Sequence, residues 1–369
     1  MLTVGNIKTF GATPTGLTAP DSLTIGDGSV FVEYGNGADS TGLSGSSTII
    51  QYDKAGQVEF TYEIAGSVDG LKYNPYTGQV WALQNQDGNT TLSLINPKTH
   101  TVTGPIQFAN QSAVQGYDDV VFKGDKVFLS YTNPSANPSP ATSPTLVELV
   151  GGEQALQRGA LITQPILTAA STGIDTVTGQ TMTVPQIDPD SLKLAPNGDL
   201  IFSSGDGGVI IYVHKPGTSQ QTVSFTPIQG VTAGSAGLDD VIKPNATSGT
   251  FYVSDASGDR VISFHVSGLN KNDYYGSVGG AQNAFGQIDS KTGVFTPLVS
   301  SANEPGFGSP HGVVFVADNS NNANSSGHSL LRQSIASSFA EAGHDPGGRL
   351  AVSDVTTHAG LLAHPSSRA

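Results

Sequence analysis

The chain has 369 residues, of which about 12% are charged, and acidic residues outnumber basic ones by 30 to 16. The formal net charge of −14 disfavours binding to nucleic acid, because phosphate contacts require lysine and arginine. The absence of cysteine excludes disulfides and thiolate metal sites. The same acidic balance suits the binding of cations.

Low lysine with abundant Gly, Thr and Asn is typical of exported bacterial proteins, so we expect a periplasmic or secreted protein. No apolar stretch approaches the roughly 18 residues that are needed to span a membrane. The opening run MLTVGNIKTF lacks the basic start and apolar core of a signal peptide. We therefore expect that the leader of an exported form is absent from this sequence.

A divergent repeat runs along the chain. Each copy has an aspartate or histidine, then a small or acidic residue, then an aliphatic run. The six copies read APDSLTI, SVDGLKY, GYDDVVF, DPDSLKL, GLDDVIK and SPHGVVF. Their first core residues are Asp21, Asp69, Asp118, Asp190, Asp239 and His311, at intervals of 48, 49, 72, 49 and 72 residues. The long intervals equal the basic unit plus an insertion.

A turn and a second β-rich run follow each copy, as in GDGSVFVEY, GDKVFLSY and SGTFYVSD. Most units then continue with a third and a fourth run. Four short strands in a unit of 40 to 50 residues are typical of a propeller blade. A β-sandwich also has short strands and frequent turns, but it does not explain a recurring acidic position. The sequence predicts an all-β fold, a six-bladed β-propeller.

The last blade is predicted to be split. Its first strand is expected over 312–316 and its second over 349–354, and a short amphipathic helix in the polar stretch between them is indicated by Leu331, Ile335 and Phe339. The N-terminal run TVGNIKTF is predicted to supply the outer strand and close the ring. We expect one domain over 1–369, with insertions at 133–185, 270–285 and 318–348.

The first strand of each propeller blade lines the central channel, so the six repeated residues are expected to face one another as a ring. The next residue of each copy forms a potential second layer, which consists of Ser22, Gly70, Asp119, Ser191, Asp240 and Gly312. Five carboxylates at this range raise one another's pKa unless they are protonated or bind a cation. No lysine or arginine recurs at the ring positions.

The ring therefore predicts a divalent metal site with the ligands Asp21, Asp69, Asp118, Asp190, Asp239 and His311. Ca²⁺ fits carboxylate oxygens best, Mg²⁺ comes second, and the imidazole leaves room for Mn²⁺ or Zn²⁺. His311 is then a ligand or a general base. The competing interpretation is that each aspartate hydrogen-bonds its own backbone in a turn. Glu33 could approach the channel mouth, but a solvated side chain is the simpler expectation.

At these six segments the chain resembles the calcium-dependent six-bladed propeller superfamily. The superfamily includes gluconolactonase and regucalcin-type lactonases, diisopropylfluorophosphatase, strictosidine-synthase-like proteins and streptogramin lyases. DPDSLKLAPNGDLIFSSG and SPHGVVFVAD carry the resemblance best. It implies that Asp69, Asp118, Asp190 and Asp239 hold the metal and that Asp21 and His311 complete the ring. The lactonases mix Glu and Asn with Asp, whereas this ring has neither Glu nor Asn.

The leading functional hypothesis is a metal-dependent hydrolase of lactones or other esters, with a small-molecule substrate at the channel mouth and with His311 and Asp190 as catalytic residues. A lyase of the streptogramin type is a second enzymatic hypothesis. The alternative outside enzymes is an exported binding or scaffold propeller with a structural cation. The sequence does not specify the substrate, the metal or the oligomeric state.

Overall fold

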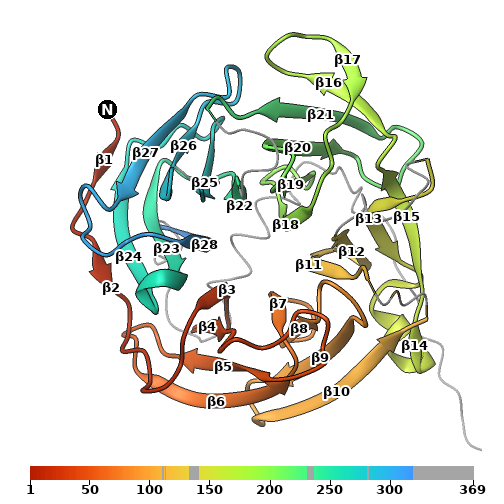
Figure 1. Ribbon diagram of the computed structural model, residues 1–369, viewed down its shortest axis with the longest axis vertical. Coiled ribbons are helices and arrows are strands. Elements are labelled where there is room, and N and C mark those ends of the chain that lie inside the picture. The colour runs from red at the N-terminus through yellow and green to blue at the C-terminus, as the bar shows by residue number, and fades with distance from the viewer. Residues whose placement is uncertain (110–111, 113, 133–140, 231–236, 281, 319–369) are drawn as a thin grey trace, which may run out of the picture.

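The computed structural model describes residues 1–369 apart from 110–111, 113, 133–140, 231–236, 281 and 319–369. Over the described residues the chain forms six sheets, which stand as blades around a central channel (Figure 1). The predicted six-bladed β-propeller is confirmed. No helix within these residues is long and apolar enough to cross a membrane.

Blades 1 to 4 follow the chain, and the innermost strand comes first in each. Blade 1 contains β3 (Pro20–Gly26), β4 (Ser29–Tyr34), β5 (Ser46–Tyr52) and β6 (Val58–Ala65). Blade 2 contains β7 (Val68–Asn74), β8 (Gln79–Gln84), β9 (Thr91–Asn96) and β10 (Thr101–Phe108). Blade 3 contains β11 (Tyr117–Lys123), β12 (Lys126–Tyr131), β13 (Pro144–Leu149) and β15 (Thr163–Thr168). Blade 4 contains β18 (Pro189–Leu194), β19 (Leu200–Ser204), β20 (Val209–His214) and β21 (Thr222–Pro227).

Blades 5 and 6 exchange strands. Blade 5 contains β22 (Leu238–Ile242), β25 (Tyr274–Val278), β26 (Ala284–Ile288) and β27 (Phe295–Ser300). Blade 6 contains β28 (Pro310–Ala317), β23 (Ser248–Asp255) and β24 (Arg260–Ser267). On its outer edge β24 pairs with β1 (Thr3–Val4) and β2 (Lys8–Thr9), so the N-terminal strand closes the ring as predicted.

This exchange corrects the prediction for blade 6. The strand beside β28 is β23, in register from Gly249↔Ala317 to Asp255↔Pro310, and not 349–354, which lies outside the described residues. Aromatic packing explains the choice. The Phe251 ring on β23 lies 4.9 Å from the Phe315 ring of β28, and 5.0 Å from the Phe285 ring of blade 5. The helix expected within 318–348 also falls outside the described residues.

Two other predicted insertions contain blade strands. Residues 270–285 are not an inserted loop, because they hold β25 and the start of β26, which replace the strands that blade 5 gives to blade 6. The interval 133–185 holds β13 and β15 of blade 3. Its added parts are the 3₁₀ helix η2 (Gly152–Arg158) with β14 (Ala160–Leu161), and the hairpin of β16 (Thr172–Asp175) and β17 (Thr181–Thr183) on the edge of blade 4. A further 3₁₀ turn, η3 (Ala256–Gly258), links β23 to β24.

The hydrophobic core lies between neighbouring blades. Trp81 of blade 2, for example, packs edge-on against Phe122 of blade 3, with ring centroids 4.9 Å apart. Each sheet thus buries both faces and presents only its innermost strand to the channel.

Candidate functional site

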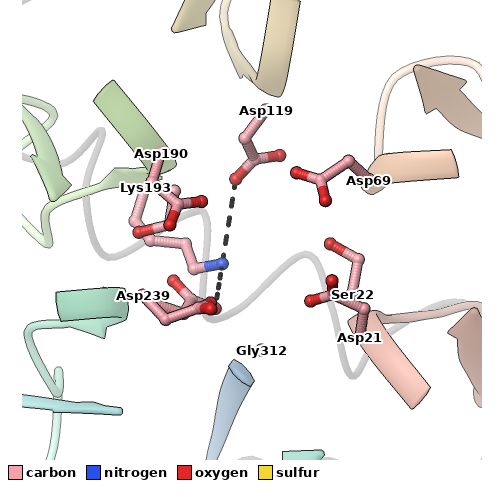
Figure 2. Close-up of a pocket in the computed structure, with 10 residues that line it drawn as sticks. Asp21, Ser22, Asp69, Asp119, Asp190, Lys193, Asp239 and Gly312 are labelled. Atoms are coloured by element: carbon pink, nitrogen blue, oxygen red, sulfur yellow. Dashed lines mark ion pairs between the residues drawn. The ribbon is translucent and has the colours of Figure 1, made fainter. Parts of the chain in front are cut away.

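The six repeated residues lie at equivalent places in the fold. Each is the second residue of its inner strand, and the six are Asp21 on β3, Asp69 on β7, Asp118 on β11, Asp190 on β18, Asp239 on β22 and His311 on β28. Figure 2 shows the carboxyl groups of Asp21, Asp69, Asp190 and Asp239 around one shared space at the channel mouth. The structure therefore brings together the ring residues that the repeat predicted.

A β-bulge occurs at the ring position in every blade. The pairing register between the inner strand and its neighbour shifts there in all six sheets, for example between Tyr117 and Val120 and between Pro189 and Leu192. A bulge sets two residues against one on the partner strand and re-aims their side chains. The ring residue and the next residue can therefore both face the channel, which produces the two layers.

The ring divides into two groups of different chemistry. Ligand atoms of Asp69, Asp118 and Asp190 lie within 4.8 Å of one another, and so do those of Asp21, Asp239 and His311. The first group contains carboxylates alone. The second places an imidazole between two carboxylates: His311 Nδ1 lies 2.7 Å from Asp239 Oδ2 and 3.4 Å from Asp21 Oδ1.

Burial raises the pKa of all three carboxyl groups of the first group, which we call the carboxylate triad. Asp69 and Asp190 titrate well above their usual range, because desolvation is reinforced by the charges of neighbouring aspartates. The pKa of Asp118 rises to about 7, although hydrogen bonds from Asp69 and Thr132 lower it. No salt bridge reaches the carboxylate triad from any described lysine, arginine or histidine, so its charge is not balanced within the protein.

The second group, which we call the histidine clamp, balances half of its own negative charge, because one imidazolium faces two carboxylates. The nearby Asp239 carboxylate, assisted by Asp21, raises the pKa of His311 to about 12 against the opposing effect of burial. His311 is therefore an imidazolium at neutral pH. Its other nitrogen, Nε2, lies 3.2 Å from Ser309 Oγ.

Two lysines that the repeat did not single out pair with the aspartates of the second layer, and we count them as part of that layer from here on. Lys72 Nζ lies 2.9 Å from Asp119 Oδ2, and Lys193 Nζ lies 2.7 Å from Asp240 Oδ2. Lys193 Nζ also lies 3.9 Å from Asp119 Oδ2 (Figure 2). Both lysines stand three residues after a ring aspartate, in SVDGLKY and DPDSLKL, so a comparison of the third residue after each ring position could have found them.

Asp119 and Asp240 also bind the backbone of the next blade. Asp119 Oδ2 accepts a hydrogen bond from Leu192 N at 2.9 Å, and Asp240 Oδ2 accepts one from Val313 N at 2.6 Å. Asp119 Oδ1 and Asp240 Oδ1 also accept hydrogen bonds from the N–H groups of Val120 and Val241, so the competing interpretation of an aspartate that bonds nearby backbone describes the second residue of each Asp-Asp pair. The first residue faces the ring.

Glu33 corrects an expectation. It lies on β4 and is fully buried, not solvated. No hydrogen bond of ordinary geometry reaches either carboxyl oxygen, and burial, together with the charge of Asp21, holds the pKa of Glu33 well above its usual range. Gln86 is a second unpredicted neighbour: its Nε2 donates to Asp69 Oδ1 at 3.4 Å, whereas its Oε1 is buried without a partner.

The donor set of the carboxylate triad fits a hard divalent cation. Asp69, Asp118 and Asp190 offer only oxygen ligands, which Ca²⁺ and Mg²⁺ prefer, and the free Oε1 of Gln86 adds a neutral oxygen beside them. A cation would also remove the repulsion that raises the three pKa values. The histidine clamp already contains one cation, the His311 imidazolium, whose charge opposes the binding of a metal ion there.

The fold and the site together define a six-bladed β-propeller with an acidic channel mouth. No protein-family model and no curated protein matches the chain. Among solved structures, it is similar to a catalytically inactive variant of virginiamycin B lyase from Staphylococcus aureus, with a TM-score of 0.48, 13% identity, and 85% of this chain and 93% of that chain covered. It is also similar to the periplasmic gluconolactonase of Pseudomonas aeruginosa, with a TM-score of 0.47, 11% identity, and 86% and 99% covered. These similarities concern the fold alone.

Proposed function

We propose that this protein is a metal-dependent hydrolase of lactones or other esters, with the cation held by Asp69, Asp118 and Asp190. The observation that supports the proposal is the convergence of three carboxylates from three blades to within 4.8 Å, without a cationic partner among the described side chains. A bound divalent cation would polarise the substrate carbonyl and lower the pKa of a water molecule. The composition favours a periplasmic or secreted location, and one gluconolactonase of similar fold is periplasmic.

The ring supplies a proton acceptor and a proton donor. His311 is protonated at neutral pH, so it acts as an acid and not as the general base considered from the sequence. It can donate from Nε2 to the departing alcohol oxygen. The proton of the attacking water would go to a ring carboxylate, and we assign this role to Asp190, because as a ligand of the proposed cation it would lie beside the activated water.

The test compares metal-depleted protein with protein loaded with Ca²⁺, Mg²⁺ or Mn²⁺ on a panel of lactones and simple esters. We expect hydrolysis with at least one cation, and its loss in Asp190→Asn and His311→Gln while the fold is retained. Asp27→Asn is the matched control, because Asp27 is exposed beyond the opposite end of β3. Equal inactivity of all metal-loaded samples would contradict the proposal.

A binding propeller with a structural cation is the second candidate. The deep burial of Asp118, which is only 5% exposed, favours it, because a ligand so enclosed holds an ion more readily than it meets a substrate. In that case calcium raises the melting temperature of the protein and no compound of the panel is turned over.

A further inference from the structure

The second layer of the channel is a closed set of four charges. Lys72 and Lys193 come from blades 2 and 4, and Asp119 and Asp240 come from blades 3 and 5, so cations and anions alternate around the axis. Lys193 Nζ lies within 3.9 Å of one oxygen of each aspartate. Lys72 Nζ bonds Asp119 Oδ2 at 2.9 Å and also donates to the carbonyl oxygen of Leu192 at 3.3 Å.

All four groups are removed from solvent. The lysine side chains are 15% and 14% exposed, and those of Asp119 and Asp240 are 8% and 5% exposed. A buried charge needs a partner of opposite sign. With two ammonium groups and two carboxylates, the second layer is electrically neutral, whereas the ring directly beside it holds five aspartates against one imidazolium.

We propose that Lys72 and Lys193 serve as a built-in substitute for a divalent cation, so that the channel takes one metal ion, at the ring, and excludes a second from its axis. The binding of one metal ion at the ring rests on the proposed function. The exclusion of a second ion by the lysines rests on the second layer alone. Two ammonium groups carry the charge of one Ca²⁺, and they occupy the space between the oxygens that would otherwise bind it.

Removing the lysines should therefore create a metal site. Lys72→Met with Lys193→Met keeps side chains of similar length but leaves Asp119 and Asp240 without a counter-charge. Their Oδ2 atoms keep the backbone hydrogen bonds from Leu192 and Val313 but lose their ammonium partners, and together with the carbonyl oxygen of Leu192 they are hard oxygen ligands of the kind Ca²⁺ binds. One Ca²⁺ in this place restores the neutrality of the layer.

The experiment counts Ca²⁺ per chain in EDTA-treated protein, by calorimetric titration and by elemental analysis after dialysis against CaCl₂. We expect the double lysine variant to bind one ion more than the wild type, and its melting temperature to rise more with Ca²⁺. The control is the same variant with Asp119→Asn and Asp240→Asn added, which should lose the extra ion.

The two proposals fail separately. A wild-type count of zero contradicts the metal site in the ring, but the gain of one ion on removing the lysines still supports their role. An unchanged count, a wild type that binds two ions, or a double variant that stays unfolded in saturating Ca²⁺ would each overturn the role of the lysines.

Discussion

The ring and the second layer are adjacent, are built by the same six bulges and contain aspartates from the same strands, yet their charges are balanced differently. The aspartates of the second layer have ammonium partners within 3 Å and backbone donors from the next blade. Among the described residues, the carboxylate triad of the ring has neither an ammonium partner nor a backbone donor, and burial raises the pKa of all its members. The difference separates acidic residues that stabilise the propeller from acidic residues that are available to a ligand.

The comparison also shows why an acidic repeat alone does not define a site. Asp118 and Asp119 are neighbours in sequence and both face the channel, but only Asp119 has a lysine partner. The function that we propose rests on the missing counter-charge of the carboxylate triad and not on the number of aspartates in the ring.

The largest effect is expected from breaking the second layer. Asp240→Asn should lower the free energy of unfolding by about 4 kcal/mol, because it leaves the Lys193 ammonium buried beside a neutral group. Chemical denaturation of the metal-free protein measures the change. An unaltered stability would mean that the second layer contributes little, and the contrast with the ring would disappear.

The next effect is a dependence of stability on pH. A carboxyl whose pKa is higher in the folded protein than in the unfolded chain favours folding while it is protonated, and this stabilisation is lost as the pH rises through the folded pKa. For Asp118 the window runs from its usual value of 3.8 to about 7, and at about 1.4 kcal/mol per unit the part of this window above pH 5 should lower the free energy of unfolding by roughly 3 kcal/mol.

Denaturation of metal-free protein between pH 5 and pH 8 tests this decline, with Asp118→Asn as the control that should show a smaller slope. Saturating Ca²⁺ should abolish the slope, because the cation takes the place of the protons. A free energy of unfolding that increases with pH in the metal-free protein would contradict this prediction.

Neutralising a ring aspartate should have the reverse effect of neutralising one in the second layer. Asp190→Asn relieves repulsion and should stabilise the metal-free fold by about 1 kcal/mol. It also removes one of three carboxylate ligands, so Ca²⁺ affinity should fall roughly 100-fold. Melting temperatures with and without Ca²⁺ report both changes, and a destabilised apo variant with unchanged affinity would show Asp190 to be structural.

The smallest effect concerns Glu33. The equivalent positions of blades 3, 4 and 6 carry Ser130, Ser203 and Ser254, whose hydroxyl groups bond the backbone of inner strands. Glu33→Ser should therefore raise the free energy of unfolding by about 0.5 kcal/mol, because it removes a buried carboxyl whose desolvation is not offset by a hydrogen bond of ordinary geometry. The matched variant Ser130→Ala should be destabilised. A loss of stability in Glu33→Ser would indicate that Glu33 has a partner that the fold requires.

Local sequence signals predicted most of the fold. The repeated inner strand and the turns after it identify six blades, and TVGNIKTF closes the ring because its strands find a free edge on β24. Local sequence signals could not predict the exchange of strands between blades 5 and 6. Only Lys243–Thr247 separates β22 from β23, so the segment resembles an ordinary hairpin, and the packing of Phe251 between two blades is a long-range property.

The position of the site could be predicted, but its internal division could not. Six aligned residues on inner strands must meet at one depth of a closed ring. Which of them share a charge depends on distances across the channel, so the placement of His311 between Asp21 and Asp239 becomes visible only in three dimensions. Glu33 was misjudged for a related reason, because the alternation of a strand does not say how deeply the channel mouth buries its last residues.

The most direct test is a crystal structure of the protein grown with Mn²⁺, with an anomalous difference map calculated at the manganese edge. We predict one peak in the channel, between the carboxylates of Asp69, Asp118 and Asp190. A map without a peak there, or with its peak between Asp21, Asp239 and His311, would contradict the assignment of the unbalanced charge to the carboxylate triad.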